Sequence, residues 1–175
     1  ELAESRTDLQ ARVDLANRTG ANLYVAIHSN RSPNSFQRGV EVWYDPNRDH
    51  SLANLRLSGR LLQGVIAELT AYGYPAVTRG ILNAECHEFH VALGICLPLF
   101  VLAPPAILTR AQVVSAGIPP DRFAFRPGDD LVLTRATEMP AALVELLFVS
   151  NAGDVATLRD GNARQAIARG LARAI

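Results

Sequence analysis

The stretch Ala21-Asn-Leu-Tyr-Val-Ala-Ile-His-Ser-Asn30 joins a short apolar run to a polar end. The run from Asn22 to Ile27 predicts a short buried strand, which delivers His28-Ser29-Asn30 at its carboxyl end. In open α/β sheets, ligands and catalytic groups gather at that end of the strands. A single histidine in this place is most often structural, so the role of His28 depends on what the rest of the chain provides.

Composition limits the classes of function that the chain can have. Of its 175 residues, 49% are hydrophobic and 19% are charged, which is normal for one globular domain with a single core. The formal net charge is zero, so we expect no nucleic-acid partner. Prolines interrupt the apolar segment Val91–Leu108, whereas a membrane span needs about 20 uninterrupted apolar residues. We therefore expect no membrane span.

Helical patterns occur at both ends and in the middle of the chain. Thr7-x-x-Gln10 has the form of a capping box, and it predicts a first helix that ends at Gly20. A long helix is expected from Ser51 to Tyr72. Asn162 is expected to cap the last helix.

Strand patterns alternate with these helices. Gly39–Tyr44 alternates in polarity, which indicates a strand near a sheet edge, and Ala141–Phe148 is typical of a strand buried on both faces in a parallel sheet. We therefore predict a single α/β domain over residues 1–175. Its twisted, mostly parallel sheet is expected to carry helices on both faces.

Glu145 interrupts the apolar run Ala141–Phe148. A buried carboxylate is usually paired, bound to a metal or held at a raised pKa for proton transfer, because an unpaired buried charge is strongly disfavoured. A salt bridge to one of the seventeen arginines is the structural alternative. Together with His28, Glu145 supplies two groups that a zinc hydrolase needs, an imidazole ligand and a carboxylate that accepts and returns a proton.

Five blocks of sequence then occur in a recognisable order. They are Leu9-x-x-Arg12-Val-x-Leu-Ala-Asn17, Ala21–Asn30, Gly39-Val-Glu-Val-Trp-Tyr44, Thr78-Arg-Gly80 and Met139-Pro-Ala-Ala-Leu-Val-Glu145-Leu-Leu-Phe-Val-Ser-Asn151. Together these blocks closely resemble the zinc-dependent N-acetylmuramoyl-L-alanine amidases of bacterial cell-wall metabolism.

The resemblance implies that His28 is a zinc ligand and Glu145 the catalytic glutamate. The expected reaction is hydrolysis of the amide between N-acetylmuramic acid and the L-alanine of the stem peptide, with peptidoglycan as the partner. Because of that substrate, we expect an extracytoplasmic location, in the periplasm, in the cell wall or as a secreted protein, although the sequence shows no signal peptide.

The family carries two further zinc ligands that have no counterpart here. They are a histidine in a Gly-His-Gly-Gly type motif and a glutamate, and both precede the position of Glu1. We therefore expect the chain to lack the first strand of the family fold and to be inactive by itself. The alternatives are a catalytically inactive relative that binds peptidoglycan or a protein partner, and a metal-dependent peptidase that acts on free peptides.

The resemblance does not extend over an enlarged insertion expected at about residues 81–137. Phe100-Val-Leu102 and Leu131-Val-Leu133 could each fill the strand that precedes Met139-Pro140, and we favour the first. Cys86-His-Glu-Phe-His90 lacks the His-Glu-x-x-His spacing of a zinc helix. For His87 a substrate contact, a metal ligand and an ordinary structural role remain open.

The remaining candidates are two substrate contacts and two cysteines. Asn30 follows the predicted zinc ligand closely. Arg79 could bind substrate carboxylates or carbonyls, with a surface arginine as the alternative. Cys86 and Cys96 do not have metal-ligand spacing, and we favour free thiols over a disulfide.

Overall fold

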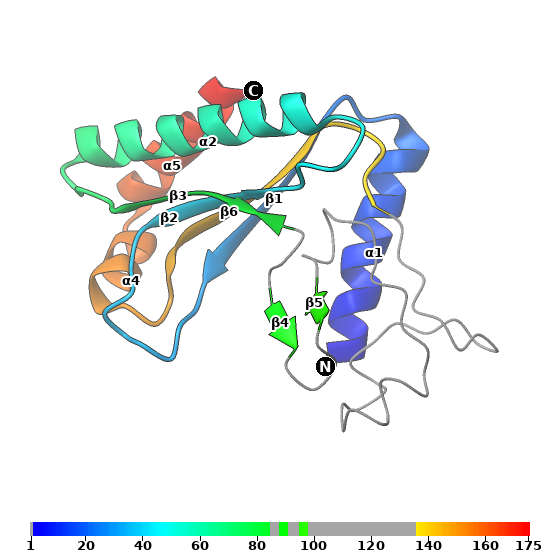
Figure 1. The fold of residues 1–175 in the computed structure, drawn as a ribbon. Coiled ribbons are helices and arrows are strands. Elements are labelled where there is room, and N and C mark those ends of the chain that lie inside the picture. Colours follow the sequence, from blue (N-terminus) through cyan, green and yellow to red (C-terminus); the bar gives the residue numbers. More distant parts are fainter. Residues whose placement is uncertain (1, 85–87, 91–94, 98–135) are drawn as a thin grey trace. The chain divides into compact units, whose positions relative to one another are not determined.

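The computed structural model describes residues 2–84, 88–90, 95–97 and 136–175. In chain order the elements are α1 (Leu2–Thr19), β1 (Tyr24–Asn30), β2 (Val40–Tyr44), α2 (Ser51–Tyr72), β3 (Thr78–Asn83), β4 (Glu88–His90), β5 (Ile95–Leu97), β6 (Ala141–Phe148), α4 (Ala152–Arg159) and α5 (Gly161–Ala174) (Figure 1). The chain forms two compact units, residues 1–24 with 83–139 and residues 25–82 with 140–175.

The second unit is built on a sheet with the strand order β1-β6-β2-β3. The apolar run Ala141–Phe148 forms β6, which has a neighbour on each side and is buried along its whole length except at Glu145. β2 pairs antiparallel with β6, so that Val40 lies opposite Leu146 and Glu41 lies opposite Glu145. The α/β class is confirmed, and the sheet is mixed.

One face of this sheet carries the apolar core. Its buried members come from β2, β6, α2 and α5, and they include Val40, Val42, Leu61, Leu62, Val65, Leu69, Val144, Leu147 and Ile167. Helix α2 packs against both β2 and β6. The Asn54 side chain fixes α2 to the start of β6, because the backbone N–H of Ala141 donates to Asn54 Oδ1 over 2.8 Å.

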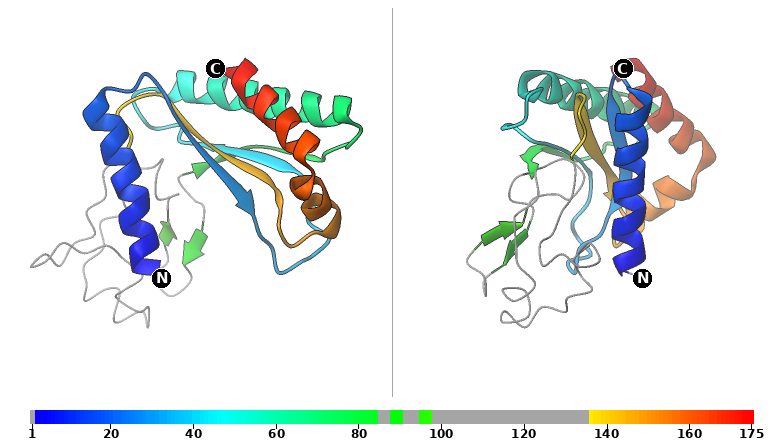
Figure 2. Two further views of the ribbon diagram at one scale, coloured as in Figure 1. Left: turned by 180° about the vertical axis from the view of Figure 1, so that it is seen from behind. Right: turned by 90° about the vertical axis from the view of Figure 1, so that its right-hand side faces the viewer.

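Helices α2 and α5 cross at a pair of glycines (Figure 2). A Cβ atom on Gly64 would lie 2.4 Å from the carbonyl oxygen of Gly170, and a Cβ on Gly170 would lie 2.5 Å from the oxygen of Gly64. Both distances are below van der Waals contact, so the two backbones approach this closely only because neither position carries a side chain.

The helix ends agree with the sequence in part. α2 covers the expected residues, and Gly73 ends it in the left-handed conformation at φ 99°. α5 is capped by Asp160 rather than Asn162, because Asp160 Oδ1 accepts the backbone N–H groups of Asn162 and Ala163. The capping box at Thr7 was also wrong, since α1 already begins at Leu2.

Two strands also differ from expectation. β2 is an inner strand rather than an edge strand, because Thr78–Asn83 forms β3 beside it. This segment carries little strand signal, since it contains a polar pair and a glycine. β1 continues to Asn30, so His28 lies within the strand and not beyond its end.

In the first unit, Asn17 near the end of α1 binds the segment that leads to β6. Its side-chain nitrogen donates to the carbonyl oxygen of Ala136 over 3.0 Å, and its side-chain oxygen accepts the N–H of Glu138 over 3.0 Å. β4 and β5 form an antiparallel pair. The segments Phe100–Leu102 and Leu131–Leu133, and most of the expected insertion, lie outside the described residues.

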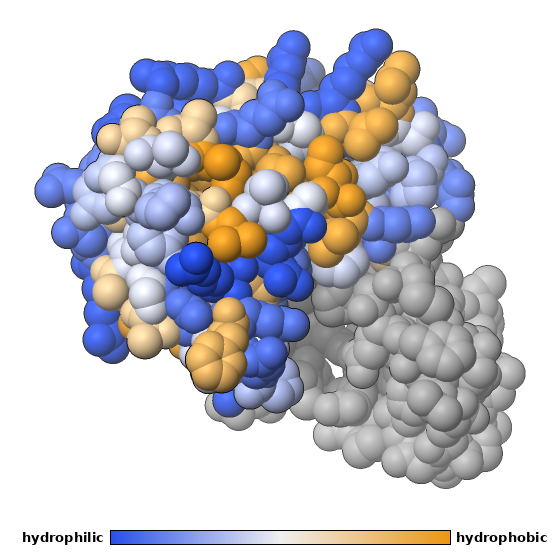
Figure 3. Space-filling model, turned by 60° about the vertical axis from the view of Figure 1, so that its left-hand side comes forward, coloured by the Kyte–Doolittle hydropathy of each residue, from blue (hydrophilic) through white to orange (hydrophobic). Residues whose placement is uncertain are grey.

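The described surface mixes polar and apolar groups. Figure 3 shows one face on which apolar side chains are bordered by hydrophilic ones. Large apolar side chains with more than half of their surface exposed are Leu15, Ile27, Phe36, Leu52 and Ile175. Among the described residues, no helix combines the length and the apolar character needed to cross a membrane.

Candidate active site

The face of the sheet opposite the core carries the polar candidates. Val40 and Val42 of β2 enter the core, so Glu41 between them projects from the other face, because side chains alternate along a strand. The same alternation places Glu145 of β6 on that face, between Val144 and Leu146. His28 of β1, the neighbouring strand, reaches this face as well.

His28 and Glu145 are brought together by the pairing of their strands. The distance from His28 Nδ1 to Glu145 Oε1 is 3.8 Å. One third of the His28 side chain is exposed but only 15% of the Glu145 side chain. The histidine therefore reaches solvent, whereas the carboxylate lies beneath it in a largely enclosed position.

Glu145 has an unusual environment for a carboxylate. Its Oε2 atom is buried and accepts no hydrogen bond from the described part of the chain. Burial and, as the smaller contribution, the charge of Glu41 on the opposite strand together raise the pKa of Glu145 to about 7. A carboxyl group with a pKa in this range can both accept and donate a proton near neutral pH.

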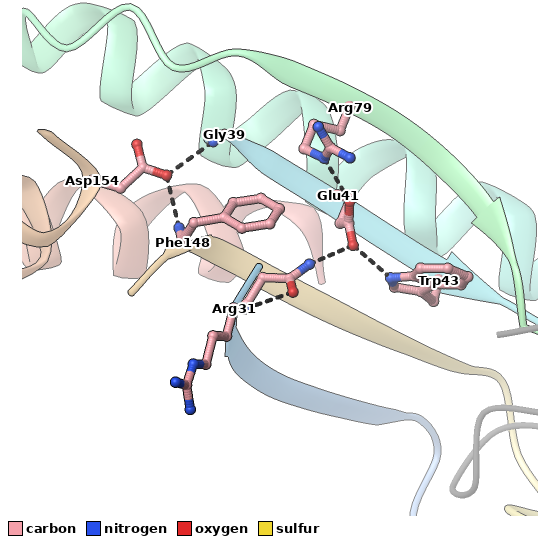
Figure 4. Close-up of polar contacts among 8 residues, drawn as sticks. Arg31, Gly39, Glu41, Trp43, Arg79, Phe148 and Asp154 are labelled. Carbon is pink, nitrogen blue, oxygen red and sulfur yellow. Dashed lines mark hydrogen bonds and ion pairs between the residues drawn. The ribbon is translucent and has the colours of Figure 1, made fainter. Parts of the chain in front are cut away.

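Glu41 is more deeply buried but fully paired (Figure 4). Arg79 Nε donates to its Oε2 atom over 2.8 Å. Its Oε1 atom accepts the side-chain N–H of Asn30 over 2.6 Å and the indole N–H of Trp43 over 3.1 Å. Glu41 thus connects the end of β1 to β3, and this role was not predicted from the sequence. The available signal was a carboxylate within a strand that also carries valines.

A change of strand geometry at Gly80 places Arg79 beside Glu41. Arg79 binds Glu41 on the polar face, yet Ile81, two residues further on, packs against the core. Regular alternation would put both side chains on one face. Gly80 adopts φ 96°, a conformation that favours glycine, and the alternation changes at this residue.

A second break occurs at Leu147 of β6. Leu146 and Leu147 both enter the core, and Leu147 has φ 63°, an uncommon value for a leucine. Phe148 consequently lies on the polar face, where the Arg79 guanidinium is 5.1 Å from the centre of its ring. This cation–π contact adds to the ion pair that holds Arg79.

Asp154 links Gly39, which precedes β2, to Phe148, the last residue of β6. Its Oδ2 atom accepts the backbone N–H of Gly39 over 2.9 Å and that of Phe148 over 2.7 Å, and its Oδ1 atom accepts the hydroxyl of Tyr74. The residue is fully buried. Asp154 therefore has a structural role, and nothing in its local sequence pointed to these distant partners.

The predicted substrate contacts have different positions. Asn30 and Arg79 both bind Glu41, so their side chains already take part in the protein's own network. His87 and Cys86 lie outside the described residues. The roles assigned to these residues from the sequence remain predictions.

A zinc ion held in a catalytic site takes three protein ligands and a water molecule. The described residues contain no group of three His, Cys, Asp or Glu side chains that could hold a metal ion. The partly exposed imidazole of His28 fits one ligand position, and the adjacent Glu145 has a buried oxygen without a partner. The described residues therefore fit part of a zinc site and not a complete one.

Comparison with known proteins places these features in a family. The sequence profile of the N-acetylmuramoyl-L-alanine amidase family matches residues 2–175. No curated protein sequence matches the chain.

Three solved structures illustrate the similarity. The catalytic domain of CwlV, an N-acetylmuramoyl-L-alanine amidase from Bacillus (Paenibacillus) polymyxa var. colistinus, is 25% identical with a TM-score of 0.57, over 95% of this chain and 62% of that one. An N-acetylmuramoyl-L-alanine amidase from Clostridium difficile 630 is 17% identical with a TM-score of 0.59, over the same shares. The CwlD amidase from Clostridioides difficile, in complex with the GerS lipoprotein, is 16% identical with a TM-score of 0.55, over 93% of this chain and 57% of that one. The chain thus spans less than two thirds of the length of these relatives.

Proposed function

Because this chain belongs to the N-acetylmuramoyl-L-alanine amidase family, we propose that it carries the catalytic glutamate of a peptidoglycan hydrolase. The bond to be cleaved is the amide between N-acetylmuramic acid and the L-alanine of the stem peptide. The observation that supports this proposal is the enclosed Glu145 carboxylate, 3.8 Å from the partly exposed His28.

In this proposal His28 is one ligand of a zinc ion whose other protein ligands are not among the described residues. When bound, zinc lowers the pKa of a coordinated water to about 7 and polarises a carbonyl group. The polar face of the sheet, between β1 and β6, is where the substrate amide would lie. Since the substrate is a cell-wall polymer, the protein would act outside the cytoplasm.

Glu145 would manage the proton in the reaction. Its carboxylate takes a proton from the attacking water and returns it to the departing amide nitrogen, a step that an amine leaving group requires. The enclosed position of Glu145 keeps this carboxylate from full hydration, and the absence of a partner for Oε2 among the described residues leaves one oxygen available for the proton. Glu41 cannot take this role, because three donors already occupy its oxygens.

A second candidate function is a catalytically inactive amidase relative that binds peptidoglycan or a protein partner. It is favoured by the incomplete set of zinc ligands among the described residues. The CwlD relative forms a complex with a lipoprotein, which gives a precedent for a protein partner in this fold.

Hydrolysis of purified muropeptides by the natural full-length protein separates these candidates. Release of stem peptide with a free L-alanine amino group, together with stoichiometric zinc by metal analysis, is expected for the amidase. Binding of muropeptide without release would favour the inactive relative. Equal cleavage of free peptides that lack the sugar would contradict the amidase assignment and indicate a peptidase.

A further inference from the structure

A hollow of about 720 Å³ lies where β1 and β6 end. Its lining comes from the segments that directly follow the two strands carrying His28 and Glu145. The lining residues are Arg31, Ser32, Pro33, Ser35, Val149 and Ser150. No function assigned above uses this hollow.

Hydrogen bonds hold the two sides of the hollow together. The backbone N–H of Val149 donates to the carbonyl oxygen of Asn30 over 2.8 Å, and the N–H of Ser32 donates to Ser150 Oγ over 3.0 Å. The Asn151 side chain donates to the carbonyl oxygen of Ser35 over 2.8 Å. A site formed in advance loses little conformational entropy when a ligand binds.

Arg31 gives the hollow a positive charge. It is the only charged residue of the lining, and its side chain forms no ion pair with any described residue. Its backbone N–H donates to Asn30 Oδ1 over 2.7 Å, and the same Asn30 side chain donates to Glu41. Figure 4 shows the Arg31 side chain directed away from the Glu41 cluster, which consists of Glu41 and its partners Asn30, Trp43 and Arg79. The guanidinium is therefore available to an anionic ligand, and it suits a carboxylate.

The position of the hollow indicates which part of a substrate would enter it. Arg31 follows His28 by three residues, about 10 Å along an extended strand. An extended peptide covers the same distance in about three residues. In uncleaved substrate the lactyl carboxyl group is part of the scissile amide, so the sugar next to it offers no carboxylate. The free carboxylates of the substrate lie on the peptide.

We propose that this hollow binds a free carboxylate of the stem peptide through Arg31, at the second or third residue beyond the scissile amide. The proposal rests on the proposed function, since it takes its substrate from it. The serine hydroxyls and Val149 then contact the adjoining peptide backbone and aliphatic groups.

The test is an NMR titration of this chain with two peptides. The first is N-acetyl-L-Ala-γ-D-Glu-meso-diaminopimelic acid, which has free carboxylates on its second and third residues, and the second is the same peptide with all of its carboxylates converted to carboxamides. We expect the acidic peptide to bind at least fivefold more tightly and to shift the amide signals of Ser32, Val149 and Ser150. Equal affinities, or shifts confined to other residues, would overturn the proposal.

Two variants with the same change of charge make the test specific. Arg31→Gln is expected to reduce affinity for the acidic peptide fivefold to tenfold and to leave affinity for the carboxamide unchanged. Arg60→Gln removes an exposed arginine of α2 and is expected to change neither affinity. A loss of equal size in both variants would indicate nonspecific attraction of charge and overturn the proposal.

A further arm replaces the peptide with an oligomer of glycerol phosphate. Binding of this polymer as tight as that of the acidic peptide would show a general anion site and overturn the assignment to a stem peptide. Because none of these measurements requires turnover, a failure of the binding proposal is distinguishable from a failure of the amidase proposal. An active amidase whose hollow binds no peptide carboxylate would contradict the binding proposal and leave the amidase proposal intact.

Discussion

The substitution Glu41→Gln tests whether the Glu41 cluster stabilises the sheet. Glutamine has nearly the same shape, and its carbonyl oxygen can still accept hydrogen bonds from Asn30 and Trp43. Its amide group, however, faces Arg79 with a donor and no charge. The ion pair from Arg79 Nε to Oε2, now 2.8 Å long, is therefore lost.

The expected cost follows from burial. Removing one partner of a fully buried ion pair costs about 3–5 kcal/mol. The Arg79 side chain is one third exposed whereas that of Glu41 is only 5% exposed. Water can therefore solvate part of the Arg79 guanidinium after the substitution, which reduces the cost. We expect the free energy of unfolding to fall by about 2–3 kcal/mol.

Urea unfolding followed by tryptophan fluorescence is a suitable measurement. Trp43 is the single tryptophan of the chain, and its indole N–H donates to Glu41, so the signal comes from within the cluster. The double variant Glu41→Gln/Arg79→Gln should lose at least about 1 kcal/mol less than the sum of the two single variants.

Glu68→Gln is the matched control. Glu68 also pairs with arginines, Arg169 and Arg173, but their side chains are 53% and 72% exposed. An ion pair in that setting contributes about 0–1 kcal/mol. If Glu41→Gln costs no more than Glu68→Gln, the Glu41 cluster does not stabilise the sheet as argued here.

Three further predictions address catalysis, pH and packing. In the full-length protein, Glu145→Gln is expected to abolish muropeptide hydrolysis and to retain zinc by metal analysis, and normal turnover by this variant would remove Glu145 from the mechanism. Burial and the hydrogen bond to Asp154 raise the pKa of Tyr74 from 10 to about 12, so the protonated phenol stabilises the fold below pH 10 and this contribution is lost as the pH rises through 12. The loss is expected to be about 1 kcal/mol because the side chain is partly solvated. The measurement is the urea midpoint of unfolding at pH 9 and at pH 11.5. The difference between these two midpoints should be smaller in Tyr74→Phe than in the unchanged protein. Gly64→Ala is expected to destabilise the fold by about 2–3 kcal/mol through a clash with Gly170. Gly59→Ala is the control, because its Cβ would meet only Ile81 at 3.9 Å, and we expect it to be neutral or stabilising. Thermal denaturation measures both effects.

Local patterns predicted the elements whose signal lies within one segment. The apolar run with a single glutamate gave β6, and the spacing from Ser51 to Gly73 gave α2 with its end. The choice between Asp160 and Asn162 as the cap of α5 was not decidable from residue type, because both are good N-cap residues. Only the geometry of the loop places Asp160 where its side chain reaches two backbone N–H groups.

Contacts between distant segments could not be predicted in the same way. The pairing of β1 with β6, which no local pattern reveals, brings His28 near Glu145. Glu41, however, resembled a half-exposed residue of an edge strand. Its burial depends on β3, which has little strand signal, and on Arg79, whose position depends on the backbone conformation of Gly80.

The two glutamates at the centre of the sheet show how one strand pair supports two different roles. Glu41 and Glu145 lie directly opposite each other on β2 and β6, an arrangement that is unfavourable for two like charges. Three donors bind Glu41, while Glu145 Oε2 has no partner among the described residues. The difference in hydrogen bonding indicates a structural role for Glu41 and supports our proposal that Glu145 transfers the proton. The charge that Glu41 places across the strand pair acts in the same direction as burial, toward a protonated Glu145. The cluster that stabilises the sheet therefore also sets the environment of the proposed catalytic residue.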